Sequence, residues 1–134
     1  MRAPLLLVKA LAPHMNRGGR IISMSSIFAR EPYAGFDAYA ASKSGLEGLT
    51  RQWAATLGKS RGITANAIVC GTIETDMING YGDEVLEPIR ERALAEHRLG
   101  TADDVAQVVA FLASEGSRWV TGQCIGVHGG RIFN

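Results

Sequence analysis

Tyr39 and Lys43 are the two residues of this sequence whose types and spacing could transfer a proton as a pair. They stand four positions apart in a segment that predicts a helix, so their side chains share one face of it. A free phenol has a pKa near about 10, and a tyrosine therefore acts on an alcohol near neutral pH only beside a cation that stabilises the phenolate. A lysine ammonium is such a cation. The spacing also arises by chance, so it is weak evidence when taken alone.

Ser26 offers a hydroxyl that could hold a substrate oxygen beside Tyr39. It directly follows residues 20–25, which predict a short strand, and ligands bind at the carboxyl ends of strands in parallel sheets. A neutral hydroxyl at such a place can donate to a carbonyl or to a developing alkoxide. A serine at a strand end also commonly bonds the next turn, and that structural alternative stays open.

The elements that must position these residues follow from hydrophobic spacing and turn residues. The predicted helices span residues 3–15, 38–57, 84–96 and a segment that opens at Thr101, and the predicted strands span 20–25, 63–69 and 123–127. Asp37 is the expected cap of the second helix. The inner face of that helix is expected to comprise Leu46, Leu49, Trp53 and Leu57. Short apolar strands that alternate with helices predict an α/β fold, a parallel sheet covered on both faces.

Composition narrows the class of protein further. The chain has 134 residues, of which 46% are hydrophobic and 20% charged, and this composition is typical of a globular domain. Its formal net charge of +1 gives no field that would attract nucleic acid or an acidic membrane. The apolar run at residues 5–8 is too short for a signal peptide or a membrane span, so we expect a cytoplasmic protein. Cys70 and Cys124 are too few for a disulfide framework, and no metal site is expected.

Ser26 and the Tyr39-x-x-x-Lys43 motif, with their flanking segments, resemble the short-chain dehydrogenase/reductase family. The segments that carry the resemblance are residues 19–26 (the strand with the active serine), 39–54 (the catalytic helix), 63–77 (a strand and the loop on the nicotinamide side), and 98–114 and 119–130 (the last helix and strand). They cover essentially the whole chain in the family's order. Two positions depart from the family pattern: Cys70 replaces a proline, and His128 replaces an acidic residue or asparagine.

The resemblance implies an NAD(P)-dependent oxidoreductase that interconverts a ketone and a secondary alcohol. It implies that Tyr39 is the acid/base, that Lys43 stabilises the phenolate and binds the nicotinamide ribose, and that Ser26 orients the substrate oxygen. With Tyr39 and Lys43, the residues that match the cofactor-contacting positions are Gly71, Ile73 and Thr75. The implied cofactor is NADP or NAD, with NADP slightly favoured. The family also implies a homo-oligomer through residues 3–15 and 38–57, and a small carbonyl or alcohol as substrate.

The resemblance is to the C-terminal half of the family's catalytic domain. No G-x-x-x-G-x-G phosphate-binding loop occurs in the sequence. We therefore expect residues 1–134 to form one incomplete Rossmann-like domain, with the last three strands of the sheet and without the dinucleotide-binding half. Two alternatives stay open. The chain could be a cofactor-free remnant that acts as an interaction subunit or is inactive, or its site could perform non-redox isomerisation or dehydration.

Overall fold

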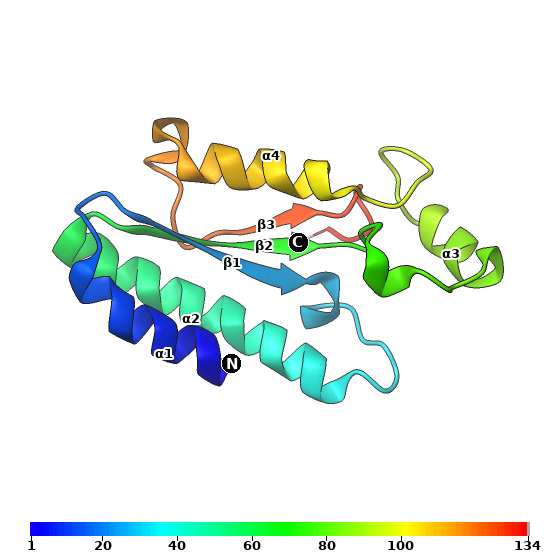
Figure 1. Cartoon of the computed structure of the whole chain (residues 1–134), viewed down its shortest axis with the longest axis horizontal. Helices are drawn as coiled ribbons and strands as arrows, with labels where there is room; N and C mark the ends of the chain where they lie inside the picture. The colour runs from blue at the N-terminus through cyan, green and yellow to red at the C-terminus, as the bar shows by residue number, and fades with distance from the viewer. Residues whose placement is uncertain (134) are drawn as a thin grey trace.

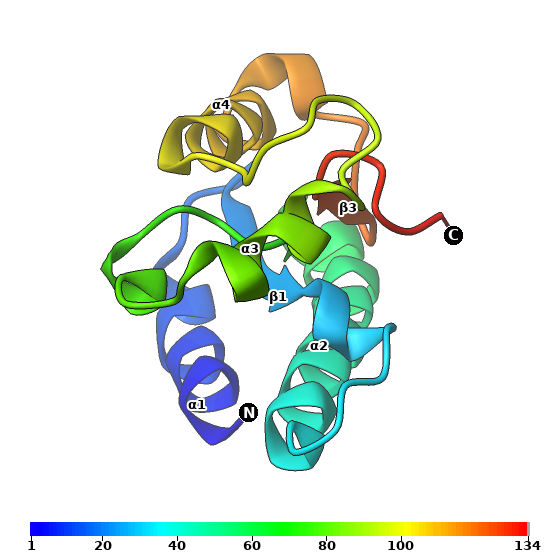
Figure 2. The same cartoon turned by 90° about the vertical axis from the view of Figure 1, so that its right-hand side faces the viewer.

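The chain folds around a parallel sheet of three strands in a computed structural model that describes residues 1–133. The strands are β1 (Arg20–Ser26), β2 (Thr64–Cys70) and β3 (Cys124–Val127), in the order β1-β2-β3. The α-helices are α1 (Arg2–Leu11), α2 (Asp37–Arg61), α3 (Asp83–Arg90) and α4 (Ala102–Ala113). Helices α1 and α2 lie on one face of the sheet and α4 on the other, while α3 lies beyond the carboxyl ends of the strands (Figures 1 and 2). The predicted α/β class is confirmed.

The central strand, β2, forms the middle of the core. All its residues from Thr64 to Val69 are buried, because strands flank it on both sides and helices cover both faces. On the α2 side, Ala65 packs against Leu46 and Trp53, with Leu49 and Leu57 next to them. The predicted inner face of α2 is therefore confirmed, although Glu47 and Thr50, which the hydrophobic pattern does not predict, are also buried there.

A capping box begins α4, as the Thr101 segment predicts. The Thr101 hydroxyl accepts from the Asp104 amide at 3.2 Å, and the Asp104 carboxylate accepts from the Thr101 amide at 2.6 Å. These two bonds satisfy two of the amides that a helix leaves unpaired at its start. The preceding residue, Gly100, bonds the loop that follows β2: its amide donates to Thr72, and its carbonyl accepts from Glu74. The start of α4 thus anchors a loop at the carboxyl end of the sheet.

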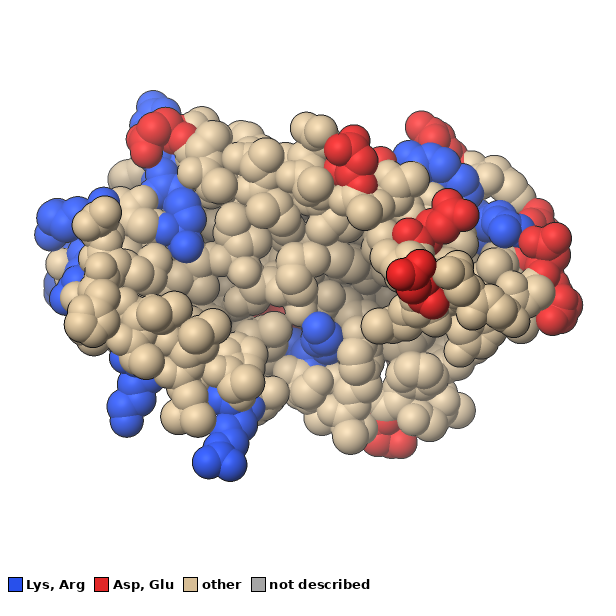
Figure 3. Space-filling view, in the orientation of Figure 1, with Lys and Arg blue, Asp and Glu red and all other residues tan. Residues whose placement is uncertain are grey.

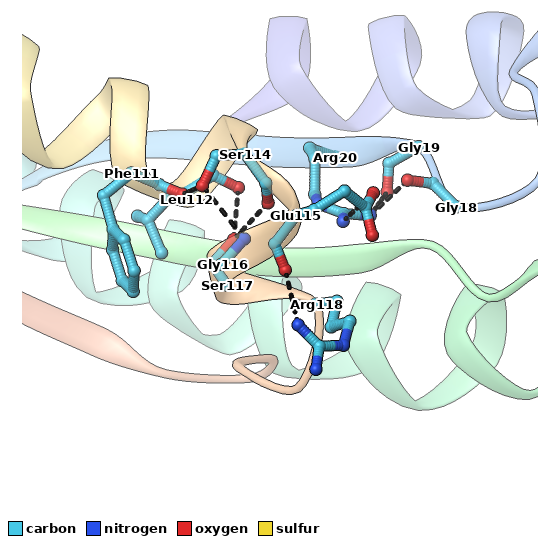
Figure 4. Close-up of polar contacts among 10 residues, drawn as sticks. All are labelled: Gly18, Gly19, Arg20, Phe111, Leu112, Ser114, Glu115, Gly116, Ser117 and Arg118. Atoms are coloured by element: carbon cyan, nitrogen blue, oxygen red, sulfur yellow. Dashed lines mark hydrogen bonds and ion pairs between the residues drawn. The ribbon is translucent and has the colours of Figure 1, made fainter.

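The other end of α4 is tied to the start of β1 (Figure 4). Arg20 donates to Glu115 at 3.2 Å and also to the Gly18 carbonyl. The fully buried Ser117 hydroxyl bonds the Leu112 carbonyl at 2.8 Å, which closes the end of the helix. Both ends of α4 are therefore held by polar contacts, in addition to its packing on the sheet.

Three boundary predictions differ from the structure. The predicted helix over 84–96 is too long, because α3 ends at Arg90 and the Ala95 amide donates to the Gly129 carbonyl instead of continuing the helix. The helix predicted over 3–15 ends at Leu11, where a 3-10 turn containing Pro13 begins, and α2 continues past residue 57 to Arg61.

The predicted cap at Asp37 is also wrong. Asp37 is the first residue of α2, and Phe36 stands at the cap position without a side-chain bond to the helix. The Phe36 ring packs against Phe28 at 4.9 Å between centroids. The residue at the cap position therefore contributes aromatic packing and not the side-chain bond that the capping rule expects.

No helix in residues 1–133 combines the length and the hydrophobicity that crossing a bilayer requires.

The capping box gives a test of how α4 is held. Replacing Thr101 by Ala (Thr101→Ala) removes the side-chain acceptor, and we expect the free energy of unfolding to fall by about 1 kcal/mol. Urea unfolding followed by circular dichroism measures this loss. The control is Thr56→Ala in the second half of α2, where the hydroxyl donates to the Gln52 carbonyl of its own helix. Equal losses in the two variants would contradict the assigned role of the cap.

Candidate active site

The three residues predicted to act together lie where β1 ends and α2 begins. Ser26 is the last residue of β1, and Tyr39 and Lys43 occupy the first two turns of α2. The Lys43 Nζ lies 5.4 Å from the centre of the Tyr39 ring. Ser26 and Tyr39 both contact Phe28: the Ser26 hydroxyl accepts from the Phe28 amide at 3.3 Å, and the Phe28 and Tyr39 ring centres are 6.2 Å apart. The fold therefore gathers the three residues at the carboxyl end of the sheet.

A backbone carbonyl of β1 holds the Lys43 ammonium. Its Nζ donates to the Met24 carbonyl at 2.7 Å. The Gly19 carbonyl accepts from the Thr64 amide, and backbone carbonyls alternate in direction along a strand. The carbonyls of the odd-numbered residues of β1 therefore point toward β2, and the Met24 carbonyl points to the open edge of the sheet. An ammonium has three N–H donors, so this bond leaves two for a ligand.

Ser26 has the local role that a strand-end serine often has, and it also keeps a free donor. Its oxygen accepts from the Phe28 amide and thereby caps the 3-10 turn Ile27–Ala29. Accepting this bond leaves the hydroxyl hydrogen available for another acceptor. The structural role and the functional role that the sequence left as alternatives are therefore compatible.

Four aromatic rings surround the start of α2. Phe28 stacks on Tyr33 at 5.2 Å, and Phe36 meets Phe28, Tyr33 and Tyr39 edge to face. Tyr39 remains 42% exposed, so its hydroxyl-bearing ring is accessible to a ligand. Such edge-to-face contacts restrict the orientation of the Tyr39 ring. Sequence analysis missed this cluster, although all four residues stand within a dozen positions of one another.

A buried carboxylate that sequence analysis did not single out lies beside the candidate residues. Glu47, on α2, is only 6% exposed. It accepts from the Ser25 hydroxyl at 2.9 Å and forms an ion pair with Arg30 at 3.2 Å. The signal in the sequence is the polar residue at position 47 within the apolar inner face of the helix.

A second carboxylate, Glu31, joins three distant segments. It accepts from Arg131 at 2.9 Å and also from Arg92, which follows α3. Burial raises the pKa of Glu31, but the hydrogen bonds and charges of Arg131 and Arg92 outweigh burial and hold the pKa below its ordinary value. The loop before Tyr39 is thus tied both to the segment after α3 and to the C-terminal tail.

The predicted cofactor-contacting residues follow β2. The Gly71 amide donates to the Val127 carbonyl at 2.9 Å, and Ile73 pairs with Gly100 as an isolated bridge. Thr75 is exposed, and its hydroxyl lies 3.5 Å from the Ile73 carbonyl. The loop is therefore held by its backbone while the Thr75 hydroxyl remains accessible.

Packing against His128 leaves no room for a side chain at Gly71. A Cβ at this position would lie 2.8 Å from the Cβ of His128, too close without a shift. Gly71 and His128 also line a cavity of about 290 Å³ that extends toward Arg98 and Arg131. None of Ser26, Tyr39 and Lys43 lines this cavity, so it is separate from the candidate catalytic residues.

Burial shifts the pKa of three further titratable groups in the direction that favours their neutral forms. Burial lowers the pKa of His128, and its buried Nδ1 has no hydrogen-bond partner within residues 1–133. Burial also raises the pKa of the free thiols Cys70 and Cys124, which makes both poor nucleophiles. In the part of the chain that the structure describes, no three His, Cys, Asp or Glu side chains gather as metal ligands.

Acidic side chains gather at the end of the molecule where α3 lies, and lysines and arginines predominate at the opposite end (Figure 3). Several of these acidic groups are paired locally. Arg90 lies 2.9 Å from both Asp83 and Glu87. These pairs link side chains within α3.

Comparison with known proteins gives matches along nearly the whole chain. The family profile described as enoyl-(acyl carrier protein) reductase matches residues 1–131. Short-chain dehydrogenase/reductase FrzI from Cladobotryum sp. is 38% identical over 98% of this chain and 54% of its own length. The 3-oxoacyl-[acyl-carrier-protein] reductase FabG from Pseudomonas aeruginosa is 46% identical over 88% of this chain and 47% of its own length.

Among solved structures, a blue fluorescent protein from a metagenomic library, in complex with NADPH, is similar to this fold with a TM-score of 0.89. It is 42% identical, and the match covers 99% of this chain and 53% of that protein. The chain thus spans about half the length of the curated relatives it matches.

The Glu31 ion pairs give a pH-dependent prediction. Because the pKa of Glu31 is lower in the folded chain than in the unfolded one, its contribution to stability is present above the ordinary glutamate pKa of about 4.3 and is lost as the pH falls below it. We expect Glu31→Gln to lower the melting temperature at pH 7 and to make less difference under acid conditions. Thermal melts of both proteins across this pH range measure the effect. A constant difference at every pH would show that the ion pairs contribute nothing.

Proposed function

The chain belongs to the short-chain dehydrogenase/reductase family, and on that premise we propose that it carries the catalytic half of an NAD(P)-dependent oxidoreductase that interconverts a ketone and a secondary alcohol. The observation that carries this proposal is the convergence of Ser26, Tyr39 and Lys43, with the Lys43 ammonium held 5.4 Å from the Tyr39 ring. Relatives support the reaction type, since one of them is named a 3-oxoacyl reductase and a 3-oxoacyl group contains a ketone.

In the proposed reaction, Tyr39 moves the proton at the substrate oxygen. In the oxidising direction its phenolate takes the proton of the alcohol, and in the reducing direction its phenol returns a proton to the forming alkoxide. The Lys43 ammonium, 5.4 Å from the centre of the Tyr39 ring, places a positive charge beside the negative charge that develops on the phenolic oxygen during the reaction. The hydride chemistry would come from a nicotinamide cofactor held beside Tyr39 and Lys43.

Ser26 orients the substrate oxygen in this scheme. The bond from the Phe28 amide uses the Ser26 oxygen as an acceptor only, and it leaves the hydroxyl hydrogen to donate to a substrate oxygen. A donor fixed in this way stabilises negative charge that develops on the oxygen during the reaction.

The residues present fit the nicotinamide end of the cofactor and not its other end. The two free N–H donors of Lys43 and the accessible Thr75 hydroxyl suit ribose and amide oxygens. Within residues 1–133, no glycine-rich loop leads from a strand into an α-helix, which is where a pyrophosphate binds. We therefore propose NADP or NAD as the cofactor of the complete protein, in which a phosphate-binding half is joined to this chain. A cytoplasmic location, where reduced thiols such as Cys70 persist, is part of the same proposal.

The Tyr39→Phe substitution tests the chemistry. In the complete protein we expect it to abolish NADPH oxidation with ethyl acetoacetate, because no other group replaces the phenolic proton. Ser26→Ala should lower kcat by about a hundredfold to a thousandfold, the effect of removing one donor to a developing oxyanion. Lys43→Ala should cost nearly as much as the tyrosine change.

Three results would contradict the proposed function or favour an alternative to it. Full turnover by a folded Tyr39→Phe protein would contradict the assignment of the acid/base. Isomerisation or dehydration that depends on Tyr39 without nucleotide would support non-redox chemistry. A folded protein that neither binds nucleotide nor turns over would support the cofactor-free remnant.

We also propose that the protein forms a homo-oligomer through α1 and α2. Helix α1 has no buried residue, and Leu6, Leu7 and Leu11 are 49%, 59% and 50% exposed. A groove of about 390 Å³ runs between α1 and α2 and is lined by apolar residues that include Val8 and Trp53. A second copy of the same two helices would cover both the groove and the leucines, as a self-complementary two-fold interface does.

Light scattering of a surface variant tests this interface. We expect Leu7→Lys to lower the average mass toward that of a single chain, because it places a charge in the contact. The matched control is Leu94→Lys, on a leucine that is 68% exposed but lies outside α1 and α2. An unchanged mass in Leu7→Lys, or an equal fall in both variants, would contradict an interface formed by these helices.

A further inference from the structure

One buried carboxylate holds both ends of the segment that contains Ser26. The Oε1 of Glu47 accepts from the Ser25 hydroxyl at 2.9 Å, and the Oε2 accepts from Arg30 at 3.2 and 3.4 Å. Ser25 and Arg30, the two ends of this segment, are therefore bonded to the two oxygens of one carboxylate on α2. The Ser26 hydroxyl and its bond to the Phe28 amide lie inside this closed segment.

The same carboxylate stands on the helix that carries the other two candidate catalytic residues. Glu47 follows Lys43 by four positions and Tyr39 by eight, so the three share one face of α2. Glu47 thus connects the segment with Ser26 to the helix with Tyr39 and Lys43 by side-chain bonds. Phe28 packing on Tyr39 and the Ser44 hydroxyl, which donates to the Ala29 carbonyl at 2.8 Å, also connect the segment to α2.

Stability alone does not account for this arrangement. The Glu47 side chain is 8% exposed and that of Arg30 is 26% exposed, so the pair is substantially removed from water. Replacing such a pair by apolar residues of similar volume is often neutral or even stabilising, because the desolvation cost offsets the attraction. A fixed position for the groups bonded to the pair is a property that apolar residues would not supply.

We propose that Glu47 is a positioning residue, which holds the Ser26 hydroxyl at the distance from Tyr39 that the reaction requires. This inference rests on the proposed function, since it assigns Ser26 a role at the substrate oxygen. Glu47 acts through Ser25 and Arg30 and touches no substrate. The sequence predicted neither its burial nor its bonds.

The test replaces the Glu47–Arg30 ion pair, called the clamp below, by apolar residues that keep the volume of the core. We expect the double variant Arg30→Met/Glu47→Leu of the complete protein to retain its melting temperature within a few degrees. Its kcat for ethyl acetoacetate with NADPH should fall by about tenfold to a hundredfold, the effect of a reactive group that is present but misplaced. The KM for NADPH should not change, and Glu47→Gln, which keeps an acceptor for Ser25, should recover most of the rate.

Coupling to Ser26 separates positioning from a merely structural role. In a Ser26→Ala background the clamp variant should cause no further loss of kcat, because the group that it positions is already gone. The matched control is Thr50→Val, which removes another buried bond between α2 and β1, from Thr50 to Ser23 at 3.3 Å. We expect its kcat to equal that of the unsubstituted protein.

Hydrogen exchange supplies a readout that does not depend on turnover. The Phe28 amide bonds the Ser26 hydroxyl, and the Arg30 and Glu31 amides bond the Ile27 carbonyl. The hydrogens of these three amides should exchange faster in the clamp variant, and their exchange rates should be unchanged in Thr50→Val. If the double variant does not fold, Ser25→Ala removes one of the two attachments and should shift kcat and exchange in the same direction.

The outcomes distinguish this inference from the proposed function. Unchanged kcat and exchange in the clamp variant, with kcat still lowered by Ser26→Ala, would overturn the role of Glu47 and leave the proposed function standing. Additive losses in the Ser26→Ala background would overturn it as well, since they indicate a structural role alone. If neither Tyr39→Phe nor Ser26→Ala affects turnover, the proposed function fails, and the inference fails with it.

Discussion

Burial of β2 on both faces is the constraint on which the rest of this structure depends. A strand whose residues from Thr64 to Val69 are all buried needs a strand on each side and a helix layer above and below. The parallel pairing of β1 and β3 with β2 brings the carboxyl ends of the strands to one edge of the sheet. The loops that begin at Ser26 and at Gly71 start at that edge. The position of the candidate site thus follows from the parallel pairing that buries β2.

The parts of this arrangement that are local could be predicted from the sequence. Tyr39 and Lys43 share a helix face because of their spacing, and Thr101 begins a helix because its neighbours supply a capping box. The end of α3 could not be predicted in this way. It depends on the Ala95 amide, which bonds the Gly129 carbonyl in a segment distant in sequence. Likewise, a capping rule does not predict Phe36 at the start of α2, where its ring packs against Phe28.

The residue types of the candidate site could be predicted from the sequence, but the contacts that hold these residues in place could not. Nothing in the pattern around Lys43 indicates that its ammonium binds the Met24 carbonyl, because that contact requires the register of two strands and the direction of a helix. Glu47 looks like a solvent-facing residue by composition, yet its neighbours bury it. A polar residue on the inner face of a helix is the kind of local inconsistency that tends to mark a functional region.

The Glu31 ion pairs have a consequence for the order in which the chain folds. They join residues 61 and 100 positions apart, whereas the Thr101 capping box joins residues only three apart. Closing a long loop costs more chain entropy than closing a short one, so we expect the Glu31 contacts to form after the sheet has brought their segments together. Contacts that are absent from the folding transition state leave the folding rate unchanged and slow unfolding instead. We therefore expect Glu31 to contribute to the lifetime of the folded chain more than to the speed with which it forms.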